Sequence, residues 1–314
     1  MSKLQGAISS DIDTLRSLYY RYGLVPAACG GADFEVGLEN FSRFLEPYGI
    51  QSTLFMVGQD FGPSRNHGVI RDIVREGHEI ANHSYTHPQG FRLLTLARQE
   101  EEISKMEKAC QQLTGKRPYG FRSPGWNVSD DVLKILRQRG YIYDSSVFPT
   151  VLSPILKMLH WYNMQGAPIA DRTTLGDWRY MTAPMKPFQT SSQTLSRPGR
   201  GGIIEFPITV TPGLRLPFFA TSVLATGIDF FKSSLKKLTE REYPLQFQFH
   251  LSDFVDYSKP GLSEEIPRSS DKVYVPKSFR VPLKGKINLF KEVLELMFES
   301  YEFMTLHQWA RLGV

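Results

Sequence analysis

Strand-like and helix-like segments alternate along this chain, and the alternation limits the fold more than any other feature. Short apolar or β-branched runs of strand length occupy residues 4–10, 51–57, 118–122 and 141–145. Apolar residues at helical spacing occur between them, in residues 37–48, 93–112 and 128–139. Such alternation is typical of a parallel sheet or barrel covered by helices. The sequence therefore predicts an α/β fold.

A pair of histidines, His83 and His87, follows the strand-like run 77–82 and is closed by Pro88. A spacing of four residues puts two imidazoles on one side of a helical turn, where both can bind one metal ion. We expect the pair where a strand ends and a loop or short turn begins. Taken alone, the spacing also fits surface or packing histidines.

Two acids, Asp11 and Asp13, stand at the carboxyl end of the first predicted strand. Alternation along an extended chain puts both carboxylates on one face, and functional side chains gather at such strand ends. Asp33 and Glu35 have the same spacing, so the acidic motif could lie there instead. We prefer the first pair because a strand directly precedes it.

The order of three motifs carries a family resemblance. These motifs are residues 77–87 around the histidines, residues 121–126 and residues 247–250. Together they resemble polysaccharide deacetylases of the NodB-homology type, carbohydrate esterase family 4, in the variety whose first motif is Asp-x-Asp. The resemblance implies a distorted (β/α)7-type barrel with an expanded loop region.

The resemblance also implies a metal site and its ligands. Asp13, His83 and His87 would hold one divalent ion and leave positions open for water and substrate. Zinc suits two imidazoles and a carboxylate, although Co²⁺, Ni²⁺, Mn²⁺ or Fe²⁺ would also be accepted.

The catalytic roles follow from the same resemblance. Asp11 would be the general base, Arg122 would pair with Asp11, and His250 would protonate the leaving nitrogen. A backbone N–H near Gly125 would donate to the oxyanion, in a substrate loop that includes Trp126. An ordinary ion pair for Arg122 and a partly buried barrel histidine for His250 are the structural alternatives.

Two further expectations concern single helices and motifs. In the helix predicted over residues 93–112, Leu96 is expected to be buried and the charge run 99–102 to face water. Asp177 and Trp178 form a two-residue match to a later motif of the family.

The whole of residues 1–314 is expected to form one catalytic domain, with residues 147–240 as an insertion or cap over the active-site mouth. Within it, residues 211–231 carry an apolar cluster followed by lysines. This segment could touch a membrane surface and admit a lipid-linked sugar, or form an inserted hairpin or a subunit interface in a homo-oligomer.

Charge and composition limit the partners. The 37 Lys+Arg against 32 Asp+Glu give a net charge of +5, which suits an anionic substrate or membrane. No concentrated Lys/Arg tract is present, so nucleic-acid binding is not expected. Cys29 and Cys110 match no common zinc or disulfide framework. Without a leader-like N-terminus or a long apolar run, we expect a cytoplasmic protein, with a peripheral position at the inner membrane face as a further expectation.

These features predict a metal-dependent hydrolase that removes an N-acetyl or N-formyl group from an amino-sugar. The substrate is expected to be a lipid-linked or cell-envelope polysaccharide precursor. One alternative is a hydrolase of a non-sugar amide, such as a cyclic imide or ureide. The other is a barrel that binds glycan or lipid without turnover.

Overall fold

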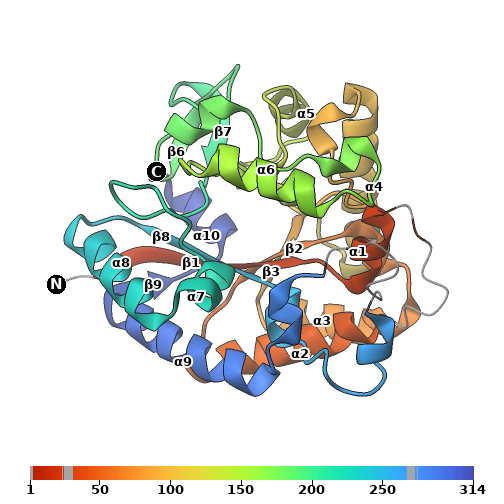
Figure 1. The fold of residues 1–314 in the computed structure, drawn as a ribbon. Coiled ribbons are helices and arrows are strands. Elements are labelled where there is room, and N and C mark those ends of the chain that lie inside the picture. The colour runs from red at the N-terminus through yellow and green to blue at the C-terminus, as the bar shows by residue number, and fades with distance from the viewer. Residues whose placement is uncertain (1–2, 23, 25–30, 267–272, 274) are drawn as a thin grey trace.

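The computed structural model describes residues 3–22, 24, 31–266, 273 and 275–314 (Figure 1). Cys29 lies outside the described residues, so the expectation about it is untested. Cys110 is a buried free thiol, and burial raises its pKa to about 11. Among the described residues, no helix combines the length and the hydropathy that crossing a bilayer requires.

A single curled sheet forms the centre of the fold. Its strands are β1 Leu4–Ile12, β2 Thr53–Met56, β3 Glu79–Asn82, β4 Gly120–Phe121, β5 Tyr143–Asp144, β6 Phe188–Ser191, β7 Gly201–Glu205, β8 Leu245–His250 and β9 Tyr301–Phe303. In the described chain, seven of them run parallel in the order β8-β1-β2-β3-β4-β5-β7, β9 pairs in parallel with the start of β1, and β6 adds an antiparallel edge. The gap between β7 and β8 is bridged where the Thr209 hydroxyl donates to the Gln246 carbonyl at 2.8 Å. The predicted barrel of seven strands is confirmed.

Helices cover the outside of this sheet. They are α1 Leu15–Arg21, α2 Ala32–Leu45, α3 His67–Arg75, α4 Leu96–Thr114, α5 Val132–Gln138, α6 Ser153–Asn163, α7 Ala220–Thr226, α8 Ile228–Glu240, α9 Leu283–Ser300 and α10 Leu306–Leu312. In Figure 1, α2, α3 and α9 lie together on one side of the sheet. Local sequence sets some of the ends: the Thr95 side chain caps the start of α4, and Gly115 ends it with φ 72°.

Apolar side chains pack on both faces of the curled sheet. Strand alternation turns Leu54 and Met56 of β2 toward the outer helices, whereas Phe55 faces inward with Tyr143 and Trp309. This inner apolar cluster closes the barrel below the carboxyl ends of the strands. The polar site described below lies directly above it.

The first third of the chain is more helical than expected. Helix α1 starts at Leu15, where the sequence analysis places no element, and α2 starts at Ala32 rather than near residue 37. Asp33 and Glu35 therefore lie in the first turn of α2, a position where carboxylates favour a helix. They do not end a strand.

The segment 147–240 only partly resembles an insertion. Its strands β6 and β7 belong to the main sheet. In the apolar cluster of residues 211–231, Phe218, Phe219 and Val223 are buried, whereas Leu214 is exposed. These three buried side chains are part of the core.

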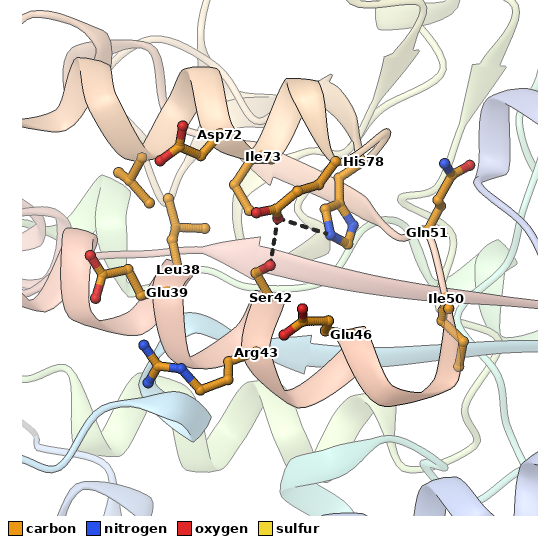
Figure 2. Close-up of a pocket in the computed structure, with 13 residues that line it drawn as sticks. Leu38, Glu39, Ser42, Arg43, Glu46, Ile50, Gln51, Asp72, Ile73 and His78 are labelled. Atoms are coloured by element: carbon orange, nitrogen blue, oxygen red, sulfur yellow. Dashed lines mark hydrogen bonds and ion pairs between the residues drawn. The ribbon is translucent and has the colours of Figure 1, made fainter.

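A pocket of about 440 Å³ lies between α2 and α3, away from the strand ends that carry the metal ligands (Figure 2). His78 lines it and is buried, with Nδ1 accepting a hydrogen bond from the Ser52 N–H at 3.0 Å. This hydrogen bond gives His78 a structural role.

Candidate metal centre and active site

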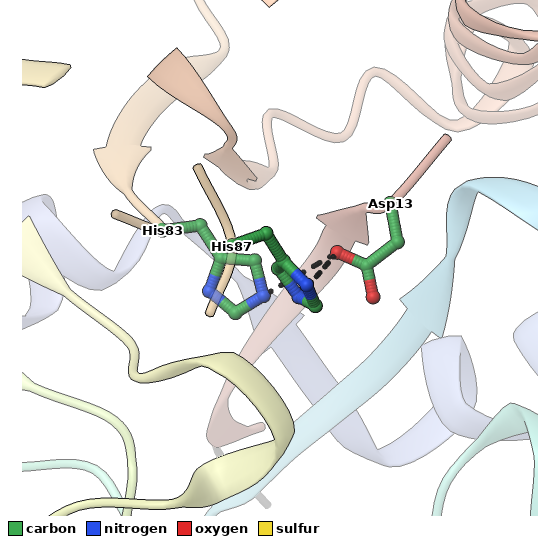
Figure 3. A group of neighbouring side chains, drawn as sticks. All are labelled: Asp13, His83 and His87. Atoms are coloured by element: carbon green, nitrogen blue, oxygen red, sulfur yellow. Dashed lines mark ion pairs between the residues drawn. The ribbon is translucent and has the colours of Figure 1, made fainter. Parts of the chain in front are cut away.

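Three side chains converge at the carboxyl edge of the sheet (Figure 3). Asp13 follows the end of β1, and His83 follows the end of β3 directly, so parallel strands deliver both to the same edge. The Asp13 Oδ1 atom lies 3.1 Å from His87 Nε2 and 3.5 Å from His83 Nε2. One ligand atom from each of the three residues lies within 4.8 Å of the others. These are the three residues that the resemblance assigns to a metal.

The two histidines converge by a route that differs from the predicted one. Residues 83–87 are not a helical turn, because Ser84 and His87 have φ values of 65° and 58°. Side chains hold this loop: Ser84 N donates to Asn82 Oδ1 at 2.8 Å, and His87 N donates to Ser84 Oγ at 3.1 Å. Left-handed backbone is costly for residues other than glycine, so these bonds stabilise a geometry that brings His87 toward Asp13.

Glu102 of α4 is the main support of the histidine loop. Its buried carboxylate accepts from Tyr85 N at 3.0 Å, from Thr86 N at 2.7 Å and from the Thr86 hydroxyl at 2.8 Å. The expectation that the charge run 99–102 faces water is wrong here, since Gln99 and Glu102 are buried and Leu96 is exposed. The inward face of α4 therefore carries Glu102 rather than Leu96, and Glu102 accepts the hydrogen bonds of the histidine loop.

His83 is oriented by a bond at its far nitrogen. Its Nδ1 lies 2.7 Å from the Arg122 carbonyl oxygen, which fixes Nδ1 as the N–H and leaves the Nε2 lone pair for a metal. No hydrogen bond among the described residues satisfies His83 Nε2 or Asp13 Oδ1, although both atoms are buried. Two facing buried acceptors without donors fit a bound cation.

Titration also favours positive charge in this cluster. Burial alone would raise the pKa of the Asp13 carboxyl, but the His87 and His83 imidazoles hold that pKa well below its ordinary value. Burial would lower the pKa of His83, yet the Asp11 and Asp13 carboxylates raise it overall. The donor set, two imidazoles and a carboxylate, fits a divalent metal of the zinc type.

Asp11 lies beside this cluster and is held at both oxygens. Arg122 Nη1 donates to Oδ1 at 2.6 Å, and Gln248 Nε2 donates to Oδ2 at 2.7 Å. The Oδ2 atom is also 4.0 Å from His83 Nε2, so it lies close to the metal ligands without joining them. These two hydrogen bonds fix the position of the Asp11 carboxylate.

Arg122 is itself fixed on every side. It is fully buried, its Nε donates to the Ser145 carbonyl at 2.9 Å, and its Nη2 donates to the Ser145 hydroxyl at 2.8 Å. The guanidinium carbon lies 3.8 Å above the ring of Phe55, the top of the inner apolar layer. The alternative of an ordinary surface ion pair is therefore excluded.

A cavity of about 270 Å³ opens over Asp11 and Asp13. Gly125, Trp126 and His250 line it, as the resemblance implies, and so do Gln89, His160, Thr174, Thr221 and Phe279. His250 is the register partner of Asp11 across β1 and β8, and its Nδ1 lies 3.5 Å from the Thr221 hydroxyl. The buried indole N–H of Trp126 has no hydrogen-bond partner among the described residues. The cavity thus offers an acid, a base and a free donor above the ligand cluster.

The competing assignments do not reach this cavity. Asp33 accepts a hydrogen bond from Leu15 N at 2.6 Å, and burial raises its pKa to about 6. Asp177 caps a short 3-10 helix, Trp178–Thr182, and pairs with Arg179, while Trp178 is exposed. Neither Asp33 nor Asp177 contacts the metal ligands.

Sequence analysis missed Glu102 and Gln248. Gln248 stands inside the motif 247–250, two residues before His250, so strand alternation could have placed it on the His250 face. Glu102 carries no such signal, because a helical charge run does not reveal which carboxylate turns inward.

Comparisons with known proteins agree with this geometry. A family model described as polysaccharide deacetylase matches residues 34–143. Peptidoglycan deacetylase of Helicobacter pylori is 28% identical over 120 residues, which are 38% of this chain and 40% of that protein. The chain therefore matches less than half the length of this curated relative.

Solved structures share the fold along nearly the whole chain. A probable polysaccharide deacetylase from Pseudomonas aeruginosa superposes with TM-score 0.56 and 14% identity, covering 98% of this chain and 89% of that one. Puue allantoinase superposes with TM-score 0.58 and 14% identity, again covering 98% and 89%. Together with the ordered motifs, the family model identifies residues 34–143 as similar to polysaccharide deacetylases, carbohydrate esterase family 4, and the solved structures show the shared fold along the rest of the chain.

Proposed function

We propose that this protein is a metal-dependent hydrolase that removes an N-acetyl or N-formyl group from an amino-sugar. The observation that carries the proposal is the cluster of Asp13, His83 and His87, whose Asp13 lines a cavity together with Asp11. Three protein ligands and open space are typical of catalytic rather than structural zinc sites.

Asp13, His83 and His87 would hold the metal. When bound, a divalent ion supplies Lewis acidity, which polarises the amide carbonyl and acidifies an attacking water. Zinc is the proposed ion because of the two imidazoles, and the same ligands would accept Co²⁺, Ni²⁺, Mn²⁺ or Fe²⁺.

Asp11 is the proposed general base, and it accepts the proton of the attacking water. The hydrogen bonds from Arg122 and Gln248 hold its carboxylate beside the cluster. As water adds to the amide carbon, negative charge develops on the carbonyl oxygen. A backbone N–H of the loop at Gly125, or the indole N–H of Trp126, is placed to donate to that oxygen.

His250 is the proposed general acid. It lies across the cavity on the strand next to Asp11 and would give a proton to the departing amine as the C–N bond breaks. The products are then a free carboxylic acid and an amino-sugar.

The proposed substrate is an amino-sugar of a lipid-linked or cell-envelope precursor. The relative named peptidoglycan deacetylase supports an N-acylated cell-wall sugar. The cavity of about 270 Å³ is small beside the usual range of ligand sites, about 300–1,000 Å³, which favours one sugar ring at a time.

A second candidate is the hydrolysis of a cyclic ureide. The fold shared with Puue allantoinase and the small cavity favour it, since a ureide ring is smaller than a sugar. The chemistry of water attack on an amide carbonyl would be unchanged.

Competing substrates test the proposal. Zinc-loaded protein is given N-acetyl and N-formyl amino-sugars and allantoin, and acid release and ring opening are followed. We expect acid release from the sugars, reduced about 10²- to 10⁴-fold in Asp11→Asn because the general base is lost. The surface variant Asp131→Asn is the control. Full activity in Asp11→Asn would contradict the proposed base, and turnover of allantoin alone would favour the second candidate.

A further inference from the structure

The exposed apolar side chains of this protein are concentrated beside the active-site cavity. Among the described residues, eight of the sixteen large apolar side chains that are exposed lie between residues 151 and 178. They are Val151, Ile155, Met158, Leu159, Trp161, Tyr162, Ile169 and Trp178, and we call them the α6 surface. Four of them, Ile155, Met158, Leu159 and Tyr162, recur at helical spacing on one face of α6, and a concentration of this kind marks an interaction site rather than scattered surface residues.

Helix α6 has its polar side chains turned inward. His160 lines the catalytic cavity, and Lys157 Nζ donates to the Gly176 carbonyl at 2.6 Å. The outer face presents Met158, with 64% of its surface exposed, and Tyr162, with 69%. A helix on the surface of a water-soluble protein normally turns its apolar side chains toward the core and its polar side chains toward water. The outer face therefore fits an apolar partner.

Cations border the α6 surface. The Arg172 guanidinium lies 5.6 Å from the ring centre of the exposed Trp161. Arg92 is near enough to Lys157 to lower the pKa of that ammonium, after the larger effect of burial. In the described part of the chain, no carboxylate lies within ion-pair distance of Arg92, Lys157 or Arg172.

Positive charges outnumber carboxylates among the described side chains at this border. Arg179 pairs with Asp130 at 3.2 Å and with Asp177 at 3.0 Å, so one guanidinium faces two carboxylates. Arg92, Lys157, Arg172 and Arg179 are four cations against these two carboxylates, and the excess of positive charge adjoins an apolar face. Phosphate groups next to acyl chains complement that pattern.

We propose that the α6 surface binds the surface of an anionic phospholipid bilayer. The apolar side chains would enter the boundary between headgroups and acyl chains, and Arg92 and Arg172 would face lipid phosphates. Because His160 of the same helix lines the cavity, the cavity would open at the membrane. This deepens the proposed function and rests on it: the amino-sugar is carried on a lipid.

The bilayer contact lies on α6 and not on residues 211–231. Phe218, Phe219 and Val223 are buried in the protein and are not available to lipid. These three side chains of residues 211–231 are core, whereas the exposed apolar side chains are those of the α6 surface.

Vesicle binding tests the proposal without any substrate. Full-length protein is sedimented with vesicles of phosphatidylcholine alone and of phosphatidylcholine with phosphatidylglycerol. We expect tighter binding to the anionic vesicles, and at least roughly tenfold weaker binding by the double variant Met158→Ser/Tyr162→Ser, which removes two adjacent apolar contacts. Leu312→Ser, at an equally exposed position on α10, is the matched control. Arg172→Gln should weaken binding to the anionic vesicles only.

Three results would overturn the proposal. These are no vesicle binding by the wild type, unchanged binding by the double variant, or a dimer that the double variant dissociates in sedimentation velocity, which would put a second copy on the α6 surface. Hydrolysis of a water-soluble N-acyl sugar, measured on the same samples, separates the two claims. Lost vesicle binding with retained hydrolysis supports the α6 surface, whereas vesicle binding without hydrolysis leaves this surface standing and removes the proposed function.

Discussion

At the scale of single residues, the metal ligands depend on a carboxylate that is not one of them. Glu102 uses both oxygens to hold Tyr85 and Thr86, two of the three residues between the histidines. Left-handed backbone at His87 is costly, and these bonds stabilise the loop that carries it. Glu102 therefore positions His87 through the backbone.

Glu102→Gln should weaken metal binding. An amide has one acceptor oxygen and would lose part of the three-bond clamp, so we expect about 10- to 100-fold lower zinc affinity. Competition with a fluorescent chelator measures it, with Glu101→Gln on the exposed side of α4 as control. Equal affinities in the two variants would contradict the positioning role.

The sequence was enough to predict that the candidate metal ligands converge, but not enough to predict the hydrogen bonds that hold the histidine loop. Asp13, His83 and His87 follow strand ends, so their convergence could be predicted from the order of the strands. The backbone route could not, because φ above zero at Ser84 and His87 depends on tertiary bonds to Asn82 and Glu102.

At the scale of elements, β8 supplies one row of polar side chains to the site. Gln246, Gln248 and His250 alternate along the strand, and the two amides donate to Ser9 and Asp11 of the neighbouring β1. One strand thus orients the base and carries the proposed acid.

Gln248→Leu should lower kcat and leave the metal in place. The Asp11 Oδ2 atom would lose its donor, and a hydrogen bond to a charged group is worth about 1.5–3 kcal/mol, so roughly a 10- to 100-fold loss is expected. Steady-state kinetics and metal content are measured together. The Gln246 side chain donates to the Ser9 hydroxyl instead of Asp11, so Gln246→Leu should lower kcat less. A larger loss of kcat in Gln246→Leu than in Gln248→Leu would be evidence against this role of β8.

Element types could be predicted better than their faces. The strands of the barrel follow from short apolar runs, but α1 was missed because its apolar residues, Leu15, Leu18 and Tyr19, recur at helical spacing over only seven residues. The exposed apolar face of α6 could not be foreseen either, because apolar helix residues are normally buried.

At the scale of the whole molecule, buried acids outside the site make stability depend on pH. Burial first, and then the Asp33 carboxylate, raises the pKa of Asp60 to about 8. The folded state holds this proton where the unfolded chain, with a pKa of about 3.9, has lost it. The contribution to stability is complete below pH ~4 and disappears as the pH rises through about 8.

Asp60→Asn should remove that pH dependence. Urea unfolding between pH 5 and pH 8 should show wild-type stability falling relative to the variant, by up to about 1.4 kcal/mol per pH unit. Zinc is present for both proteins, so its own pH dependence cancels in the difference. Asp131→Asn at the surface is the control, and parallel curves for wild type and Asp60→Asn would show that Asp60 does not bind the extra proton.

The central claim is that Asp13, His83 and His87 hold one catalytic metal. Metal content per chain is measured by mass spectrometry for wild type, His83→Ala and Asp13→Ala after zinc loading, with acetate release from N-acetyl sugars on the same samples. We predict about one metal per wild-type chain, with both metal and activity lost in the two variants. Metal retained in both variants would mean that other residues bind it, and the site described here would be wrong.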